Sequence, residues 1–377
     1  MRLLHNPSDV WKLRLIAIWC ILLVIGYTAA TIFMADILHD EKDLAIARHE
    51  ARVTKVEVDT GLSDAETEAF NAQNKSENIV VSSGMYIDRI FDVDLPMSHW
   101  KVDFYIWFNW DGPNVHPGDN FHIINGKILD KELKTKTSVN RGEVVQNYEL
   151  YRVVAEITKF FNISRYPRDD HLMTILVEDT KRQAFDLTYL PDEKGSDVSS
   201  RVKLPGYEIY SREVIEKGHA YRTRRGDPRL PENYKANFSQ LTFGIGIKRA
   251  SWGLYLKMFV GIFAAVAFSM LAFFVSPAHT SPRFGIGVGA FFASIASIYV
   301  ISSQIPLSST YTLTDFVTVS SVVTIFLTLL SSTRSVYMHH HWSDGDTWAW
   351  RFDRVVQILF VTCYTVLNIT LAASASL

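Results

Sequence analysis

RFGIGVGAFFASIASIYVISSQIPLSSTY, from Arg283 to Tyr311, is long enough to cross a bilayer, yet much of it consists of small and hydroxyl-bearing residues. A membrane helix that faces lipid is usually filled with Leu, Ile and Val, whereas glycine, alanine and serine dilute the apolar content here. We therefore expect this stretch to form a membrane helix that is surrounded by protein.

A period of about 3.6 residues separates a narrow stripe from the isoleucines, most of which lie off it. The stripe consists of Gly285, Gly289, Phe292, Ala296, either Tyr299 or Val300, and Ser303. Small residues in such a stripe either let neighbouring helices approach closely or line an ion pore with Arg283 at its inner mouth. The stretch alone leaves both interpretations open.

The composition of the chain indicates an integral membrane protein with a large aqueous domain. Its 377 residues are enough for about two domains, and 38 basic against 40 acidic residues give no reason to expect a nucleic-acid partner. Apolar residues concentrate at the two ends of the chain. Cys20 and Cys363 both lie in these apolar segments, so we interpret them as buried fillers.

Residues 1–38 contain an apolar run from Leu13 to Leu38 that follows the basic residues Lys12 and Arg14. Its length favours an uncleaved signal anchor. The alternative is a signal peptide that is cleaved near Ala29 or Ala30. Either interpretation places the following domain outside the cytoplasm.

Residues 39–84 form a polar connector. We expect a strand from Arg52 to Asp59 and a short helix from Ser63 to Gln73. Ser63 followed by Glu66 resembles a capping box, which supports a helix start at this point.

Residues 85–249 are expected to form an exported, all-β domain. Runs rich in β-branched and aromatic residues occur at 85–91, 100–110, 120–128, 146–159, 171–178, 207–215 and 238–248. The last run alternates, with Leu241, Phe243, Ile245 and Ile247 on one side. Many strands at this spacing, without helices between them, are typical of a β-sandwich.

Residues 250–377 are expected to form a bundle of four membrane helices, at 251–276, 284–301, 313–332 and 352–373. Placing the amino terminus, Arg283 and the basic loop from Thr333 to Arg351 in the cytoplasm satisfies the positive-inside rule. The expected location is the inner membrane of a cell. The β-sandwich then faces the periplasm, and the amino terminus is cytoplasmic if the leader helix is retained.

Four separated motifs carry a resemblance to a known family. They are SRYPRDDHL at 164–172, IKRASWGLYL at 247–256, SPRFGIG with IPLSSTYTLTD on either side of the small-residue helix, and MYIDRIFDVDLPMSHWKVDFYIWFNWDG at 85–112. In order and spacing, residues 85–373 resemble the pentameric ligand-gated ion channels, also called Cys-loop receptors. The loop at 164–172 lacks both flanking cysteines, as in the bacterial members of that family.

The resemblance implies a homopentamer whose outer domains bind a small-molecule agonist and thereby open a pore lined by residues 284–301. It also implies a set of coupling residues at the tips of loops and helices. These are Asp92, Asp94, Asp169, Arg249, Pro306 and Tyr311. The alternative for the charged members is an ordinary surface ion pair, and for the proline a helix stop signal.

In such a pentamer five Phe292 rings would close the pore by excluding water, and Tyr299 would form a second constriction nearer the outside. The alternative is that Phe292 packs against a neighbouring helix. Arg283 has no carboxylate nearby in the sequence, so five uncompensated guanidinium groups would favour anions. Arg283 could instead point into the subunit interface or toward lipid phosphate.

The resemblance places the agonist beneath a hairpin whose tip falls around Lys217 to Tyr234. The candidate ligand-binding residues are Tyr207, Tyr210, Tyr221, Arg224 and Tyr234. A basic, aromatic tip suits an anionic or aromatic ligand. A plain solvated loop is the alternative.

Three consecutive histidines, His339 to His341, are interpreted as a solvated turn rather than as a metal site, because neighbours in a helix do not face one another. The competing functional class is a non-conducting, membrane-anchored sensor with the same fold. An enzyme is disfavoured because no catalytic arrangement is evident, and we expect no cofactor. The expected partners are membrane lipid, inorganic ions, the unidentified agonist and further copies of the chain.

Overall fold

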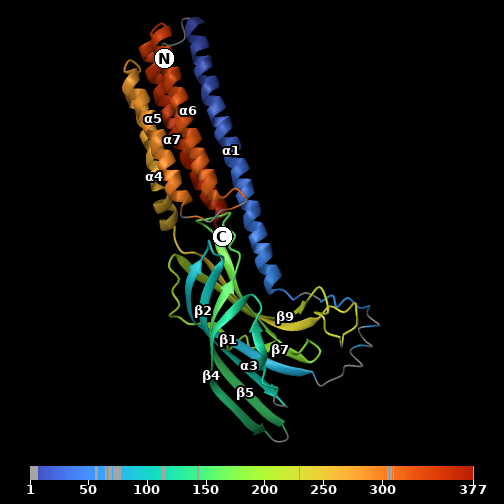
Figure 1. Cartoon of the computed structure of the whole chain (residues 1–377). Helices are drawn as coiled ribbons and strands as arrows, with labels where there is room; N and C mark the ends of the chain where they lie inside the picture. The colour runs from blue at the N-terminus through green and yellow to red at the C-terminus, as the bar shows by residue number, and fades with distance from the viewer. Residues whose placement is uncertain are drawn as a thin grey trace. The chain divides into compact units, whose positions relative to one another are not determined.

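A computed structural model describes residues 7–55, 58–63, 66, 70, 78–112, 115–141, 144–228, 230–303, 305, 308 and 310–376. The chain divides into two compact units (Figure 1). The helical unit comprises Met1–Leu44, Asn162–Asp169 and Ser251–Leu377. The sheet unit comprises Ala45–Phe161 and Asp170–Ala250.

The sheet unit contains two sheets. The six-stranded sheet has the order β4-β5-β2-β1-β7, with β8 paired to β1, and is formed by β1 (Ile79–Asp94), β2 (His99–Asp111), β4 (Gly126–Arg141), β5 (Val144–Thr158), β7 (Leu187–Pro191) and β8 (Asp197–Val198). The four-stranded sheet has the order β3-β6-β10-β9 and is formed by β3 (Phe121–Ile123), β6 (Asp170–Asp179), β9 (Tyr207–Ala220) and β10 (Asn237–Arg249). A single turn, α3 (Pro117–Asn120), precedes β3.

The two sheets share one hydrophobic core, to which alternate residues of each strand contribute. From β2 it contains Trp100, Val102, Phe104, Ile106, Phe108 and Trp110. From β10 it contains Leu241, Phe243, Ile245 and Ile247, the residues that the alternating pattern had predicted on one side. A shared apolar core between two sheets is what a two-layer β domain requires.

The strand predictions differ from the structure in four places. The first strand, β1, begins at Ile79 and not at Met85. The run predicted at 120–128 covers β3 and only the start of β4, because the solvent-facing remainder of β4 is largely polar. The short strands β7 and β8 were missed. The strand predicted from Arg52 to Asp59 is wrong because a helix continues through Val53.

The short helix predicted from Ser63 to Gln73 falls mostly outside the described residues. Its predicted capping box is present in part. The Glu66 carboxylate accepts hydrogen bonds from the Ser63 backbone N–H at 2.9 Å and from the Ser63 hydroxyl at 2.7 Å.

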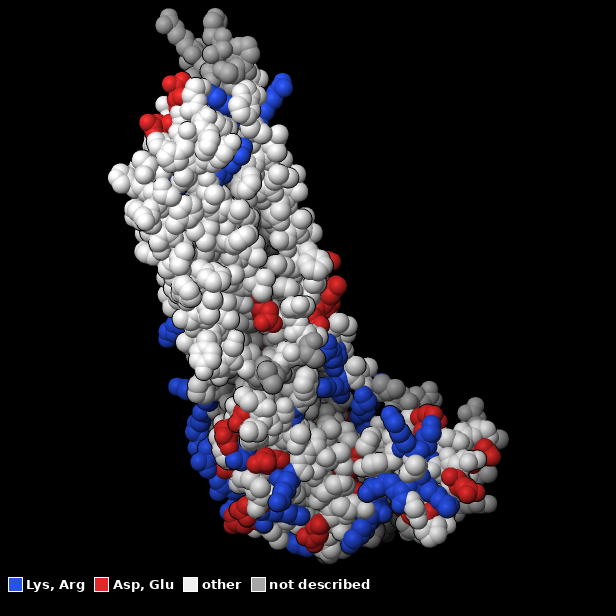
Figure 2. All heavy atoms as spheres, turned by 45° about the horizontal axis from the view of Figure 1, so that its top comes forward, with Lys and Arg blue, Asp and Glu red and all other residues white. Residues whose placement is uncertain are grey.

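The described residues contain five helices that are long and apolar enough to cross a membrane, so the chain is a membrane protein. They lie within α1 (Pro7–Val53), α4 (Gly253–Met270) with the 3₁₀ turn η1 (Leu271–Phe274), α5 (Thr280–Ser302), α6 (Leu313–His341) and α7 (Gly345–Ala375). On the face seen in Figure 2, the charged side chains of the helical unit gather near its ends and leave an uncharged band between them.

The helix α1 packs antiparallel to α6. Trp19 Nε1 donates a hydrogen bond to Ser331 Oγ at 3.2 Å, and the Tyr27 hydroxyl lies 2.6 Å from Thr324 Oγ1. Lys12 Nζ donates hydrogen bonds to the carbonyl of Ser343 at 3.0 Å and to its hydroxyl at 2.8 Å, just beyond α6. These contacts make α1 a fifth member of the helical unit. It is 47 residues long, about 70 Å, against a hydrocarbon core of about 30 Å.

The three histidines lie in the last turn of α6 and not in a loop. The predicted loop from Thr333 to Arg351 is therefore much shorter, since α6 continues to His341 and α7 begins at Gly345. The His341 ring stacks on Tyr337, with ring centroids 4.3 Å apart.

Candidate functional site

The helix α5 has one face buried in its own subunit and the opposite face open. Its buried residues are Arg283, Gly287, Ala290, Ser294 and Ile301. The predicted pore-lining residues Gly285, Gly289, Phe292, Ala296, Tyr299 and Ser303 are all exposed in the single chain. Most of them stand two residues after a buried position, which corresponds to a rotation of about 200° around the helix. The predicted stripe thus lies on the exposed side of α5, which also carries Val288, Ile295 and Val300.

The two aromatic residues of this stripe are among the most exposed apolar side chains of α5. Phe292 is 65% exposed and Tyr299 is 78% exposed. Phe292 therefore does not pack into the core of its own subunit, and its ring contacts that of the adjacent Phe291, with centroids 6.0 Å apart. The open face of α5 is available to a second copy, to lipid or to a pore.

Arg283 does not carry the free charge expected from the sequence. Its side chain is fully buried, and it donates two hydrogen bonds, at 2.8 and 2.6 Å, to the carboxylate of Asp353 on α7. Its guanidinium also donates to the Val275 carbonyl at 3.1 Å. The expectation of an uncompensated cation at a pore mouth is wrong, because a carboxylate distant in the sequence neutralises it. The charge argument for anion preference fails with it.

The segment Asn162–Asp169 lies between β5 and β6 in the chain but belongs to the helical unit. At α6, the backbone N–H of Leu313 donates to the Ser164 carbonyl at 2.8 Å, and the Thr314 hydroxyl donates to the Tyr166 carbonyl at 3.0 Å. Residues 164–166 of the segment are therefore hydrogen-bonded to the start of α6.

The two arginines of the same segment reach other helices. Arg165 donates to the Ala375 carbonyl at 3.3 Å, and Arg168 donates to the Ser376 hydroxyl at 2.9 Å, both at the end of α7. The Arg168 guanidinium also lies 4.6 Å from the ring centroid of Trp252, just before α4. The predicted signature loop therefore contacts the ends of three membrane helices.

The predicted coupling residues are divided between the units. Asp169 is buried in the helical unit, whereas Asp92, Asp94 and Arg249 belong to the sheet unit. Within its hairpin, Asp92 accepts a hydrogen bond from Lys101 Nζ at 2.5 Å, which lowers the pKa of the Asp92 carboxyl. Asp94 accepts from the backbone N–H of Met97 at 2.8 Å.

The remaining coupling residues have different surroundings. The Arg249 guanidinium lies 4.0 Å from the ring centroid of Tyr207 on the paired strand. Tyr311 is exposed and its ring stacks on Phe316 at 6.1 Å, beside the Thr312 cap of α6. Pro306 lies outside the described residues.

The five predicted ligand-binding residues do not form a single site. Tyr207 and Tyr210 lie at the start of β9, whereas Tyr221, Arg224 and Tyr234 lie beyond its end. A strand of 14 residues separates the two groups by about 40 Å. The prediction treated the hairpin as one site because its sequence gives no measure of its length in space.

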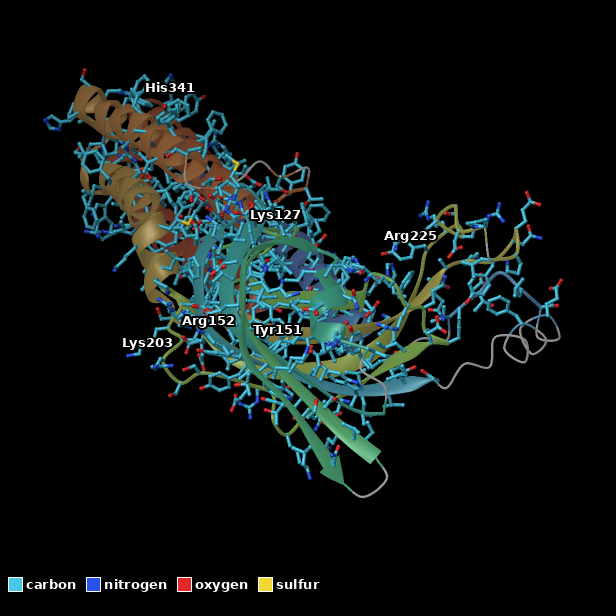
Figure 3. The ribbon with its side chains drawn as sticks, turned by 60° about the horizontal axis from the view of Figure 1, so that its bottom comes forward. Lys127, Tyr151, Arg152, Lys203, Arg225 and His341 are labelled. Atoms are coloured by element: carbon cyan, nitrogen blue, oxygen red, sulfur yellow. The ribbon has the colours of Figure 1, made fainter. Side chains whose placement is uncertain are left out.

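The group beyond β9 is partly used to build the hairpin tip itself. Tyr234 is buried, with its ring 4.8 Å from that of Phe70, and Arg224 donates to the Leu230 carbonyl at 3.1 Å. Tyr221 is half-buried beneath Arg225, whose guanidinium lies 4.4 Å from the Tyr221 ring centroid. Figure 3 shows Arg225 on this tip, far from Arg152 and Lys203.

A buried carboxylate, Glu178 at the end of β6, organises the polar groups next to the tip. It is 2.5 Å from His219 Nδ1, accepts from Gln240 Nε2 at 2.6 Å, and accepts from the Tyr221 hydroxyl at 3.2 Å. Burial, followed by Glu178, raises the pKa of Tyr221. Sequence reasoning missed Glu178, whose sole distinguishing feature was its place at the end of a predicted strand.

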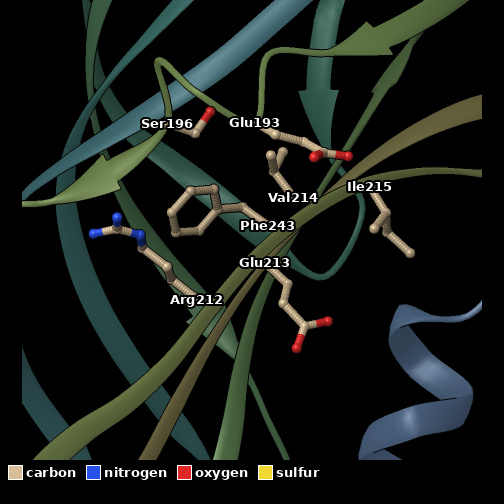
Figure 4. A pocket seen from close by; sticks show the side chains of 7 residues that line it. All are labelled: Glu193, Ser196, Arg212, Glu213, Val214, Ile215 and Phe243. Carbon is tan, nitrogen blue, oxygen red and sulfur yellow. The ribbon is translucent and has the colours of Figure 1, made fainter.

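Cavities lined by described residues open on the sheet unit. The first, of about 330 Å³, is lined by Glu193, Ser196, Arg212, Glu213, Val214, Ile215 and Phe243 (Figure 4). Its charges are mixed, and Arg212 forms an ion pair with Asp197. With Glu193 and Glu213 against Arg212 alone, the lining of this cavity carries an excess of negative charge.

The second cavity, of about 490 Å³, surrounds the buried carboxylate of Asp103. Asp103 accepts two hydrogen bonds from Arg152, at 3.0 and 2.7 Å, and one from Arg89 at 3.0 Å. Arg152 first, and then Arg89, lower the pKa of Asp103 against the opposing effect of burial. A third cavity, of about 400 Å³, lies on the outer side of the four-stranded sheet.

No protein-family model and no curated protein matches this chain. Among the described residues, no group of three or more His, Cys, Asp or Glu side chains is placed to hold a metal ion.

Proposed function

We propose that this chain is the subunit of a pentameric ligand-gated ion channel, in which α5 of each copy contributes its open face to a central pore. The open face of α5 supports the proposal. Within the apolar stretch of α5, 22% of the residues are buried inside the subunit, against 44%, 56% and 39% for α4, α6 and α7 and 11% for the peripheral α1. A helix that lines a pore between copies must keep one face free of its own subunit.

The segment Asn162–Asp169 carries the gating part of the proposal. It is separated from the end of β5 by three residues and leads directly into β6, and its backbone and arginines are hydrogen-bonded to the ends of α6 and α7. A displacement of β5 or β6 would therefore reach the helix ends through the chain itself. Two arrangements of this segment would serve as the closed and open states.

The helical unit also supports an orientation. Because α1 is antiparallel to α6, Lys12 and Arg14 lie at the same end of the bundle as the link between α6 and α7. Arg351 and Arg354 in the first turns of α7 add to this basic end. By the positive-inside rule we propose that it faces the cytoplasm and that the sheet unit faces the opposite side.

Cross-linking of the purified full-length protein and recording in planar bilayers test the proposal together. We expect cross-linked species up to five copies and unitary currents that disappear when the protein is omitted. Reversal potentials in asymmetric chloride then decide the sign of the permeant ion. Five copies without current would instead support the non-conducting sensor, and a monomer would refute both assemblies.

A further inference from the structure

The third cavity of the sheet unit is lined by basic side chains from several strands and from the end of α1. Arg52 comes from the last turn of α1, Lys159 follows β5, and Lys217 and His219 come from β9. Lys217 Nζ donates to the Ala51 carbonyl at 2.9 Å, which holds the end of α1 beside the cavity. All of these residues belong to the sheet unit.

Lys159 is the unusual member of this set. Its residue is only 9% exposed, yet among the described residues its ammonium group has no hydrogen-bond acceptor and no carboxylate within 4 Å. Its nearest ring is that of Phe161, with the centroid 5.5 Å from Nζ. A buried ammonium without such a partner is costly unless an anion approaches it.

The two carboxylates close to the cavity are engaged by other side chains. Asp170 lies 3.3 Å from His49 Nδ1, and Glu178 is held by His219 and Gln240. When Arg52, Lys159 and Lys217 are counted as cations and these two carboxylates as anions, the net charge around the cavity is one positive charge. Phe160 and Leu176 supply apolar lining beside this charge.

We propose that this cavity binds a small organic monoanion, a carboxylate attached to an apolar body. The carboxylate would accept hydrogen bonds from Lys159 and from Arg52 or Lys217. The apolar body would contact Phe160 and Leu176, within a volume of about 400 Å³ that suits a single small molecule. The inference goes beyond the proposed channel function, since binding to the sheet unit of one chain is measurable whether or not the protein conducts.

Calorimetric titration of the full-length protein at pH 6.5 tests the proposal, with benzoate as the probe and benzamide as its uncharged analogue. We expect benzoate to bind and benzamide to bind at least about tenfold more weakly, because one charge-assisted hydrogen bond contributes this much. Lys159→Met should reduce the benzoate affinity by a similar factor. Lys203→Met, at an exposed lysine of the second cavity, is the matched control and should leave it unchanged.

Titration with inorganic phosphate distinguishes a general anion site from a carboxylate site with an apolar body. Equal affinity for phosphate and benzoate would overturn the apolar part of the proposal. Equal affinity for benzoate and benzamide, or a Lys159→Met protein that binds benzoate as the unsubstituted protein does, would overturn the site itself.

Chemical labelling of the unsubstituted protein keeps the test decisive if Lys159→Met fails to fold. Acetic anhydride labels free amines, and mass spectrometry follows Lys159 and Lys203 separately. We expect saturating benzoate to slow the labelling of Lys159 several-fold and to leave Lys203 unaffected. Unchanged labelling of Lys159 in the presence of bound benzoate would place the anion elsewhere and refute the proposal.

Discussion

Arg283 at the start of α5 and Asp353 in the third turn of α7 form a buried ion pair with two hydrogen bonds, at 2.8 and 2.6 Å. The pair joins two helices that are distant in the sequence and fixes the rotation of α5 about its axis. With Arg283 turned into the subunit, the face that carries Phe292 and Tyr299 is turned away from it. The pair thus holds the Arg283 charge inside the subunit, on the side of α5 that faces away from Phe292 and Tyr299.

Removing one partner of this pair should destabilise the helical unit strongly. Asp353→Asn leaves the Arg283 guanidinium buried without its counter-charge, which costs about 3–5 kcal/mol in comparable buried pairs. We expect a clear loss of thermal stability in detergent, measured by the unfolding temperature of the purified protein.

Arg354→Gln is the matched control, because Arg354 is the exposed neighbour of Asp353 on the same helix. The double variant Arg283→Met with Asp353→Leu should recover part of the lost stability, since apolar replacements remove both charges together. If Asp353→Asn were no less stable than Arg354→Gln, the pair would have no orienting role.

The contacts of α1 predict that this helix stays in the mature protein. Three side chains of α1 form hydrogen bonds with α6 or with the residue just beyond it, namely Lys12, Trp19 and Tyr27. Cleavage near Ala29 would remove all three. We expect the intact mass of protein purified from membranes to include the residues before Ala30. A mass that corresponds to loss of these residues would show that α1 is processed despite its contacts.

Tyr27→Phe measures the strength of the α1–α6 contact. It removes one hydrogen bond between buried hydroxyls of Tyr27 and Thr324 and should lower stability by about 1 kcal/mol. Tyr337→Phe makes the same chemical change at an exposed position of α6 and should have little effect. Equal effects of the two substitutions would mean that the contact contributes nothing to the packing of α1.

If the proposed channel function is correct, Phe292→Ala should raise the unitary current or the open probability recorded without added ligand. Five rings that exclude water from the pore would be replaced by methyl groups, which lowers the barrier to a hydrated ion. Phe291→Ala is the matched control, because Phe291 stands about 100° around the helix from Phe292 and outside the stripe. Larger currents from Phe291→Ala than from Phe292→Ala would contradict the assignment of the pore face.

The sequence predicted the membrane helices and most long strands because their apolar patterns are strong and local. The stripe on α5 was also a local feature, and its residues lie together on the open face of that helix. The partner of Arg283 was missed, although Asp353 was an acidic residue at the start of a membrane segment and so required a partner. Joining the two residues needed the packing of α5 against α7.

The basic cavity could not be predicted because its residues come from separate strands and from a helix that the sequence placed elsewhere. Arg52 was predicted in a strand, since the polar residues after Leu38 conceal the continuation of α1 to Val53. Lys159 ends an ordinary alternating strand, and nothing in that pattern indicates that its side chain is buried. Burial of a polar side chain is a tertiary property.

The buried ammonium of Lys159 predicts that the stability of the sheet unit rises with pH. Burial, and then the Arg52 guanidinium, lower the pKa of Lys159 to about 7 against the opposing effect of Asp170. The unfolded chain holds this proton up to about pH 10, so between these two values it binds more protons than the folded chain. Folding is therefore increasingly favoured as pH rises from 7 to 10, by up to about 5 kcal/mol.

Denaturant unfolding of the full-length protein between pH 6 and pH 10 measures this effect, with hydrogen exchange of β5 and β6 amides reporting on the sheet unit. Lys159→Met should remove the rise and be more stable than the unsubstituted protein near pH 6, where the buried charge costs most. Lys203→Met, whose side chain is exposed, should keep the rise. Both variants retain the other ionisable groups around the cavity, which are His49, Asp170, Glu178, Lys217 and His219. A difference between the pH profiles of the two variants therefore reports on Lys159. Parallel profiles for the two variants would mean that Lys159 is not buried as a strained charge.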